Sequence, residues 1–170
     1  LFMAARLLML ADPGCNSAKA AAAVRTALDS GAALAKFREF ITAQGGDARV
    51  MTEPERLGIA ECSQEIRSDR EGIILGLDSA RLGNAAILLG AGRAQKDDVI
   101  DLTAGIRLHR RCGDFVQAGE LLATLYYKEG LDPTPARRSV AEAIAMGTVV
   151  KKKEPLIAGI LDEMGWKSLE

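Results

Sequence analysis

The periodicity of apolar residues changes near residue 60, and this change constrains the fold more than any other feature of the sequence. Before it, apolar side chains recur every three or four residues, as they do on one face of a helix. After it, short apolar runs lie between glycine turns, which is typical of short strands. The sequence therefore predicts a helical segment over residues 1–47, a linker over residues 48–60 and an α+β domain over residues 61–170.

Three helices are expected in the helical segment. Residues 1–11 are apolar on nearly every side, and an alanine-rich helix follows over residues 18–28, capped by Asn16 or Ser17. Residues 34–41 carry apolar side chains on one face and charged ones on the other. Because about 45 residues are too few to enclose a core, we expect this segment to be part of a larger domain whose remaining residues are not in this sequence.

Strand-like runs and helical stretches follow one another in the predicted α+β domain. Helical periodicity covers residues 79–89 and the stretch from Pro135 to about Met146, and residues 156–164 are amphipathic. The strand-like runs are short and bounded by turns, which favours small, mostly antiparallel sheets over a regular parallel sheet. They lie at residues 61–68, 72–77, 105–108, 115–116 and 121–126.

Composition and charge argue against several classes of function. The 170 residues contain 22 Lys and Arg against 23 Asp and Glu, a net charge of −1 that does not favour binding to nucleic acid or anionic lipid. Aromatic residues, at 4%, are too few for a row of base-stacking rings. Residues 1–11 are about half the length of a membrane span and include Arg6. We expect a cytoplasmic protein that contacts neither membrane nor nucleic acid, and a first helix that continues a longer polypeptide.

The cysteines and the single histidine lack the spacing of a catalytic or metal site. Cys15, Cys62 and Cys112 form no close pair, so we expect reduced, structural thiols. His109 has no catalytic partner nearby in the sequence, which favours a strand residue that faces solvent or a neighbouring strand. Lysines 151–153 are expected to form a solvated face. We find no metal spacing and no paired carboxylates.

The segment after residue 89 is the candidate functional loop. It contains Gly90, Gly92, Arg93 and Lys96, and glycine N–H groups together with an arginine can bind a phosphate. These glycines follow a helix instead of opening one, so a helix end and a charged surface turn are favoured over a phosphate site. A third interpretation is a loop held against another domain by its charges.

Residues 113–120 have the pattern of a small sandwiched barrel, with a Gly-Asp turn and a Gly-Glu turn around a very short strand. Lipoyl and biotinyl carrier domains share this pattern, but they also need an exposed lysine at a hairpin tip. No lysine occurs between residues 97 and 127, which argues against a carrier role.

Taken in order, these segments resemble thymidine and pyrimidine-nucleoside phosphorylases over about residues 1–126. After Tyr126 only the expected order of elements, a loop followed by helices, is similar. The segments that carry the resemblance are residues 30–34 (Ser-Gly-Ala-Ala-Leu), 36–40, 43–47, 72–74, 77–78, 82–86 (Leu-Gly-Asn-Ala-Ala), 89–93 (Leu-Gly-Ala-Gly-Arg), 96–98, 100–101, 105–106, 113–114 and 119–120.

The resemblance implies a pentosyltransferase that cleaves thymidine or another pyrimidine nucleoside with inorganic phosphate, giving the free base and a pentose 1-phosphate. It further implies a homodimer, no cofactor besides the phosphate co-substrate, and a hammerhead-like C-terminal domain. The family's phosphate-binding and base-binding residues lie upstream, and none of their motifs occurs in these 170 residues. We therefore expect a closing scaffold that is inactive alone, with residues 90–101 and 126–135 as interdomain contacts.

Two alternatives remain open on the sequence. One is a non-enzymatic module of the hammerhead or biotinyl-like type that acts only in assembly. The other is part of an AMP phosphorylase, which an additional N-terminal domain would distinguish.

Overall fold

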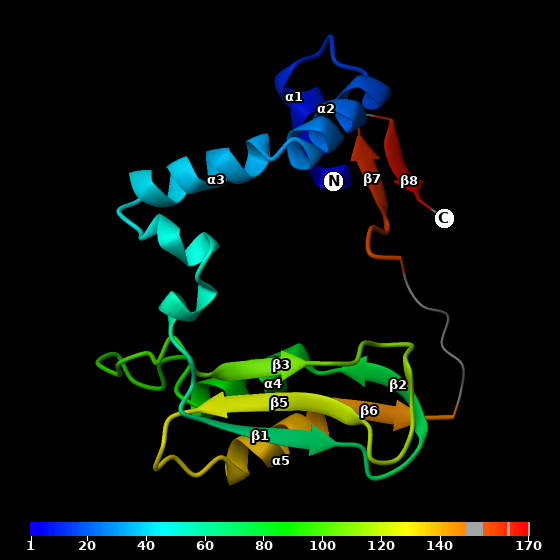
Figure 1. Ribbon diagram of the computed structural model, residues 1–170. Coiled ribbons are helices and arrows are strands. Elements are labelled where there is room, and N and C mark those ends of the chain that lie inside the picture. The colour runs from blue at the N-terminus through cyan, green and yellow to red at the C-terminus, as the bar shows by residue number, and fades with distance from the viewer. Residues whose placement is uncertain (149–154, 163, 170) are drawn as a thin grey trace. The chain divides into compact units, whose positions relative to one another are not determined.

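The computed structural model describes residues 1–148, 155–162 and 164–169 and divides the chain into two compact units, Leu1–Leu57 and Gly58–Glu170. Within these described ranges there are five α-helices and eight short strands, and every strand pair is antiparallel (Figure 1). The fold class is α+β, as the sequence predicts.

The first unit is entirely helical. Asn16 caps the second helix, since its side chain accepts the N–H of Lys19 at 2.9 Å, and Gly31 takes the left-handed conformation (φ 78°) between the second and third helices. The predicted linker, residues 48–60, holds two 3₁₀ helices before the division between the units. The elements are α1 (Phe2–Ala11), α2 (Ser17–Asp29), α3 (Ala32–Ala43), η1 (Ala48–Met51) and η2 (Pro54–Leu57).

The helices of the first unit leave much apolar surface uncovered. Of residues 1–57, all of which the structure describes, only Ala20 is buried. Phe37 and Phe40 stack with ring centroids 6.3 Å apart and are still 53% and 58% exposed. Leu7 and Leu10 of α1 are exposed as well. Exposed apolar surface of this extent is typical of helices that belong to a larger core.

The second unit contains two three-stranded sheets. In the first, β5 (Leu121–Tyr127) lies between β1 (Cys62–Arg67) and β3 (Gly105–Leu108), with Glu65 and Arg107 on either side of Thr124. In the second, β2 (Gly72–Leu77) lies between β4 (Phe115–Val116) and β6 (Ile144–Gly147). A further hairpin is formed by β7 (Gly159–Asp162) and β8 (Gly165–Ser168).

Helices α4 (Ser79–Leu88) and α5 (Thr134–Ala143) pack against each other and complete the core of the second unit. The Asp78 side chain caps α4 by accepting the N–H of Arg81 at 3.0 Å. The largest fully buried side chains come from both sheets and both helices or their ends: Ile74, Leu89, Val116, Leu125 and Val140.

The sequence-based prediction is wrong at the end of the last helix. The helix expected up to about Met146 ends at Ala143, and residues 144–147 form β6. Here Leu77 and Ile74 of β2 pair with Ile144 and Met146, so main-chain pairing to a distant strand overrides local helical periodicity. Helix-like spacing alone does not reveal such a partner.

The tail is a second point of difference from the expected loop followed by helices. The amphipathic stretch 156–164 contains β7, which pairs with β8, and Gly165 (φ 100°) is the first residue of β8 and pairs with Asp162, whereas residue 163 is outside the described residues. Lysines 151–153, predicted to form a solvated face, also lie outside the described residues. Among the helices that the structure describes, none is long and apolar enough to cross a membrane.

Candidate functional site

The candidate loop begins where α4 ends. Gly90 is in the left-handed region (φ 95°), and the N–H of Ala91 still bonds the carbonyl of Ala86 at 3.0 Å. The carbonyl of Gly90 accepts the N–H of Asp101 at 2.9 Å, which ties the two ends of the loop together. Gly90 therefore ends the helix and closes the loop, in agreement with the helix-end interpretation.

Gly92 allows the loop to fold back onto α4. A Cβ at this position would lie 2.8 Å from Cγ1 of Ile87, closer than carbon atoms can approach. This close packing against an isoleucine side chain accounts for the second glycine without any bound ligand. It weakens the interpretation of the glycine pair as a phosphate cradle.

An internal carboxylate occupies two N–H groups of the loop that could otherwise bind an anion. Oδ2 of Asp98 accepts the N–H groups of Ala94 and Gln95 at 2.9 and 2.8 Å. Arg93 and Lys96 are exposed and form neither a hydrogen bond nor an ion pair through their side chains with any part of the chain that the structure describes. Their charges are thus available to another surface, which is the property that an interdomain contact requires.

Asp101 organises the other end of the loop. Its Oδ1 accepts both the N–H and the hydroxyl of Thr103, at 2.9 and 2.7 Å. The hydrogen bonds from the Thr103 hydroxyl and N–H, with smaller help from the Ala104 N–H and the charge of Lys128, hold the pKa of Asp101 below its usual range. The sequence signal is an aspartate two residues before a threonine, the pattern of a side-chain-stabilised turn.

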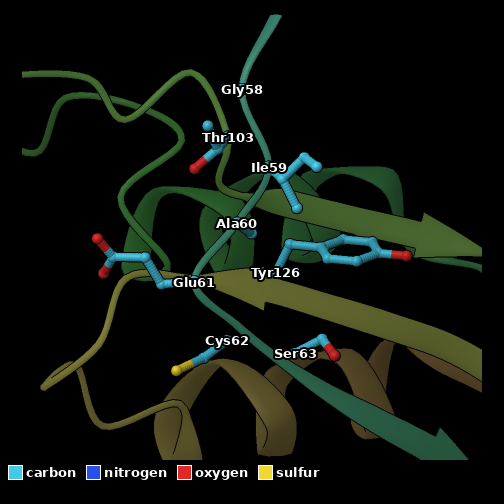
Figure 2. A pocket seen from close by; sticks show the side chains of 8 residues that line it. All are labelled: Gly58, Ile59, Ala60, Glu61, Cys62, Ser63, Thr103 and Tyr126. Atoms are coloured by element: carbon cyan, nitrogen blue, oxygen red, sulfur yellow. The ribbon is translucent and has the colours of Figure 1, made fainter. Parts of the chain in front are cut away.

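A pocket of about 430 Å³ lies next to this loop, at the start of β1 (Figure 2). It is formed by the segment that leads into β1, by the loop at Thr103 and by Tyr126 of β5. No sequence pattern indicates this pocket, because segments distant in sequence meet there. Its lining residues, all within the described chain, are Gly58, Ile59, Ala60, Glu61, Cys62, Ser63, Thr103 and Tyr126.

The chemistry of this pocket does not suit phosphorolysis. None of its eight lining residues, all described, is basic, and Glu61 is acidic. Oε2 of Glu61 accepts the N–H of Glu129 at 2.8 Å, so this carboxylate holds the loop after β5. A phosphate site needs cationic groups and N–H donors directed at the anion. The pocket is therefore not a candidate for the reaction centre.

His109 has a structural partner. Its Nε2 lies 2.9 Å from Oγ1 of Thr124 on the neighbouring strand β5, and Thr124 is buried. His109 directly follows β3, which ends at Leu108, so it is not the strand residue that the sequence predicts, although its side chain does face the neighbouring strand as expected. The three cysteines are free, and the described residues contain no group of three or more His, Cys, Asp and Glu that could hold a metal ion.

Comparisons with known proteins match part of the chain to one family. Residues 73–147 match the pyrimidine nucleoside phosphorylase C-terminal domain. The chain is 41% identical over 126 residues to the pyrimidine-nucleoside phosphorylase of Staphylococcus aureus strain bovine RF122 / ET3-1, and 40% identical to that of strain USA300. Each match covers 74% of this chain but 29% of the relative, so the chain spans less than a third of these curated relatives.

The expected resemblance is confirmed by these matches, which include the loop at Gly90, Gly92 and Arg93 and the core strands β2, β4 and β5. Residues 73–147 of the chain carry the C-terminal domain of the pyrimidine nucleoside phosphorylase family.

Proposed function

We propose that this chain is the closing scaffold of an enzyme that cleaves thymidine or another pyrimidine nucleoside with inorganic phosphate. The products are the free base and a ribose or deoxyribose 1-phosphate, and no cofactor takes part. The observation that carries the proposal is the match of residues 73–147 to the family's C-terminal domain, together with 41% identity to a named pyrimidine-nucleoside phosphorylase.

The groups that react with the nucleoside and phosphate belong, in this proposal, to the part of the enzyme that precedes the chain. In the candidate loop the N–H groups of Ala94 and Gln95 donate to Asp98, and the pocket beside the loop has no basic side chain among its described lining. Both features support a scaffolding role, because phosphorolysis depends on cations around the phosphate and on exclusion of water.

The exposed apolar helices support a larger assembly. Phe37, Phe40 and Leu34 of α3 are all more than half exposed, and about 25 cal/mol is gained for each Å² of such surface removed from water. We propose that the remainder of a helical domain covers them, within a cytoplasmic homodimer. The Gly90–Asp101 loop then contacts another part of the same enzyme when the domains close over the substrates.

The isolated chain should not catalyse the reaction. We expect the purified 170-residue chain to release no thymine from thymidine and no uracil from uridine in phosphate buffer, whereas a protein that also includes the preceding part is active. Circular dichroism checks that the isolated chain is folded. Turnover by the isolated chain would show that its own residues form the reaction centre. An inactive longer protein would instead favour the non-enzymatic assembly module, and activity on AMP would favour the related AMP phosphorylase.

A further inference from the structure

A second cavity, of about 260 Å³, lies between the turn that follows β1, helix α5 and strand β6, elements labelled in Figure 1. Its floor is apolar and is made by Ile66, Leu122, Ile144 and Met146. Ile66, Leu122 and Ile144 are members of the buried core, so the floor is rigid. Its volume is slightly below the roughly 300 Å³ at which ligand pockets usually begin, which limits an occupant to a small molecule.

The walls of this cavity carry arginines from two different elements. Arg67 and Arg70 come from the end of β1 and the turn after it, and Arg137 comes from α5. Arg67 is already engaged, because it pairs with Glu65 at 2.6 Å and donates to the carbonyl of Gly119 at 2.9 Å. It therefore frames the cavity without contributing a free charge.

Arg70 and Arg137 are not engaged in this way. Neither guanidinium forms a hydrogen bond or an ion pair with the residues that the structure describes, and both side chains are exposed. Asp69 also lines the cavity and likewise has no side-chain partner among these residues. With Arg67 paired to Glu65, the described lining of the cavity contains two arginines without a described partner and one such aspartate, an excess of one positive charge.

The turn that carries Arg70 is well fixed. The Ser68 hydroxyl donates to the carbonyl of Arg70 at 2.5 Å, and the Ser68 N–H donates to the carbonyl of Glu120 at 2.9 Å. The N–H of Gly119 in turn donates to the carbonyl of Ser68 at 2.8 Å. Because Ser68 is itself buried, the backbone of this wall is held in one conformation before any ligand arrives.

From two arginines that have no partner among the described residues and that line a cavity with an apolar floor, we infer a binding site for a small anion with an apolar body, such as an aromatic phosphate monoester or carboxylate. The anionic group binds between Arg70 and Arg137, whose planar guanidinium groups suit either oxyanion. The apolar body covers Ile66 and Met146. This site is separate from the candidate loop at Gly90 and does not depend on the proposed reaction.

Calorimetric titration of the protein with phenyl phosphate and with benzoate tests the inference. We expect both to bind. Benzyl alcohol should not bind, because it lacks an anionic group, and inorganic phosphate should bind more weakly than phenyl phosphate, because it lacks an apolar body. Tighter binding of phenyl phosphate identifies a phosphate ester as the preferred class, and tighter binding of benzoate identifies a carboxylate.

Arg70→Gln and Arg137→Gln should each weaken binding about tenfold, the loss expected for one charge-assisted contact. Arg138→Gln is the matched control, since Arg138 is an exposed neighbour on α5 that does not line the cavity. Unchanged melting temperatures would show that the variants fold. If neither probe binds at about 10 mM, a concentration well above the dissociation constants typical of specific recognition, the inference is overturned. Equal weakening by Arg138→Gln would overturn it as well.

Discussion

Asp47 fixes the start of the first 3₁₀ helix through a concentrated set of contacts with Arg49. Its Oδ1 accepts the Arg49 N–H at 3.0 Å, and its two oxygens accept the Nε–H of Arg49 at 2.9 and 3.0 Å. The side-chain and backbone hydrogen bonds from Arg49, with smaller contributions from the charges of Arg49 and Arg56, lower the pKa of Asp47 to about 2. The pair is exposed, so its main effect is to define local conformation.

Replacing Arg49 should remove the largest cause of the low pKa of Asp47, the side-chain hydrogen bonds from Arg49. We expect Arg49→Ala to raise the pKa of Asp47 from about 2 toward 3.8, measured by NMR titration of its side-chain carbon. Because the native pKa is depressed, the contact stabilises the fold above about pH 4 and is lost as the pH falls through 2. Arg25→Ala on α2 is the control and should leave the titration unchanged. An Asp47 pKa unaffected by Arg49→Ala would show that the side-chain pair does not form.

Two glycines of the α4 region illustrate opposite roles within one element. Gly83 lies inside α4 with open space around its missing Cβ, whereas Gly90, just after the helix, has φ 95°. Alanine at position 83 should raise the free energy of unfolding by about 0.5–1 kcal/mol, because glycine is the poorer helix former. Alanine at position 90 should lower it by about 1–2 kcal/mol, because a side chain disfavours the left-handed conformation. Urea unfolding of the two variants measures both changes, and changes of the same sign would contradict the assigned roles.

At the scale of secondary-structure elements, most of the described helices and strands follow from local sequence. Helix α4 has Asp78 as cap and Gly90 as its end, and β2 and β3 are short apolar runs bounded by turns. Strand β6 and the β7–β8 hairpin are exceptions. In β6, residues 144–147 continue a helical spacing and become a strand through pairing with β2. Such pairing depends on a segment some 70 residues away, which no local pattern encodes.

The candidate site was predictable only where one segment builds it. Gly90, Gly92, Arg93 and Lys96 lie within a single loop, so the sequence shows them together. By contrast, the cavity that contains Arg70 and Arg137 joins residues 67 positions apart, and the pocket of Figure 2 joins Glu61 to Tyr126. Both depend on antiparallel pairing in the folded unit, which brings distant residues to one place.

On the scale of the whole molecule, the proposed contact role of the candidate loop leads to a kinetic prediction. Arg93→Glu in the complete enzyme should lower kcat for thymidine phosphorolysis about two- to fivefold, because reversing one exposed charge at a domain contact destabilises the closed form by roughly 1 kcal/mol. Arg107→Glu is the matched control: Arg107 is also exposed and unpaired among the described residues, but it lies on β3, outside the Gly90–Asp101 loop. Steady-state kinetics at low and high salt measures the effect, which should shrink as ions screen the contact. If both variants retain the parent kcat, the loop does not contribute to closure. A loss at Arg93 that persists at high salt would instead indicate a packing role for this side chain.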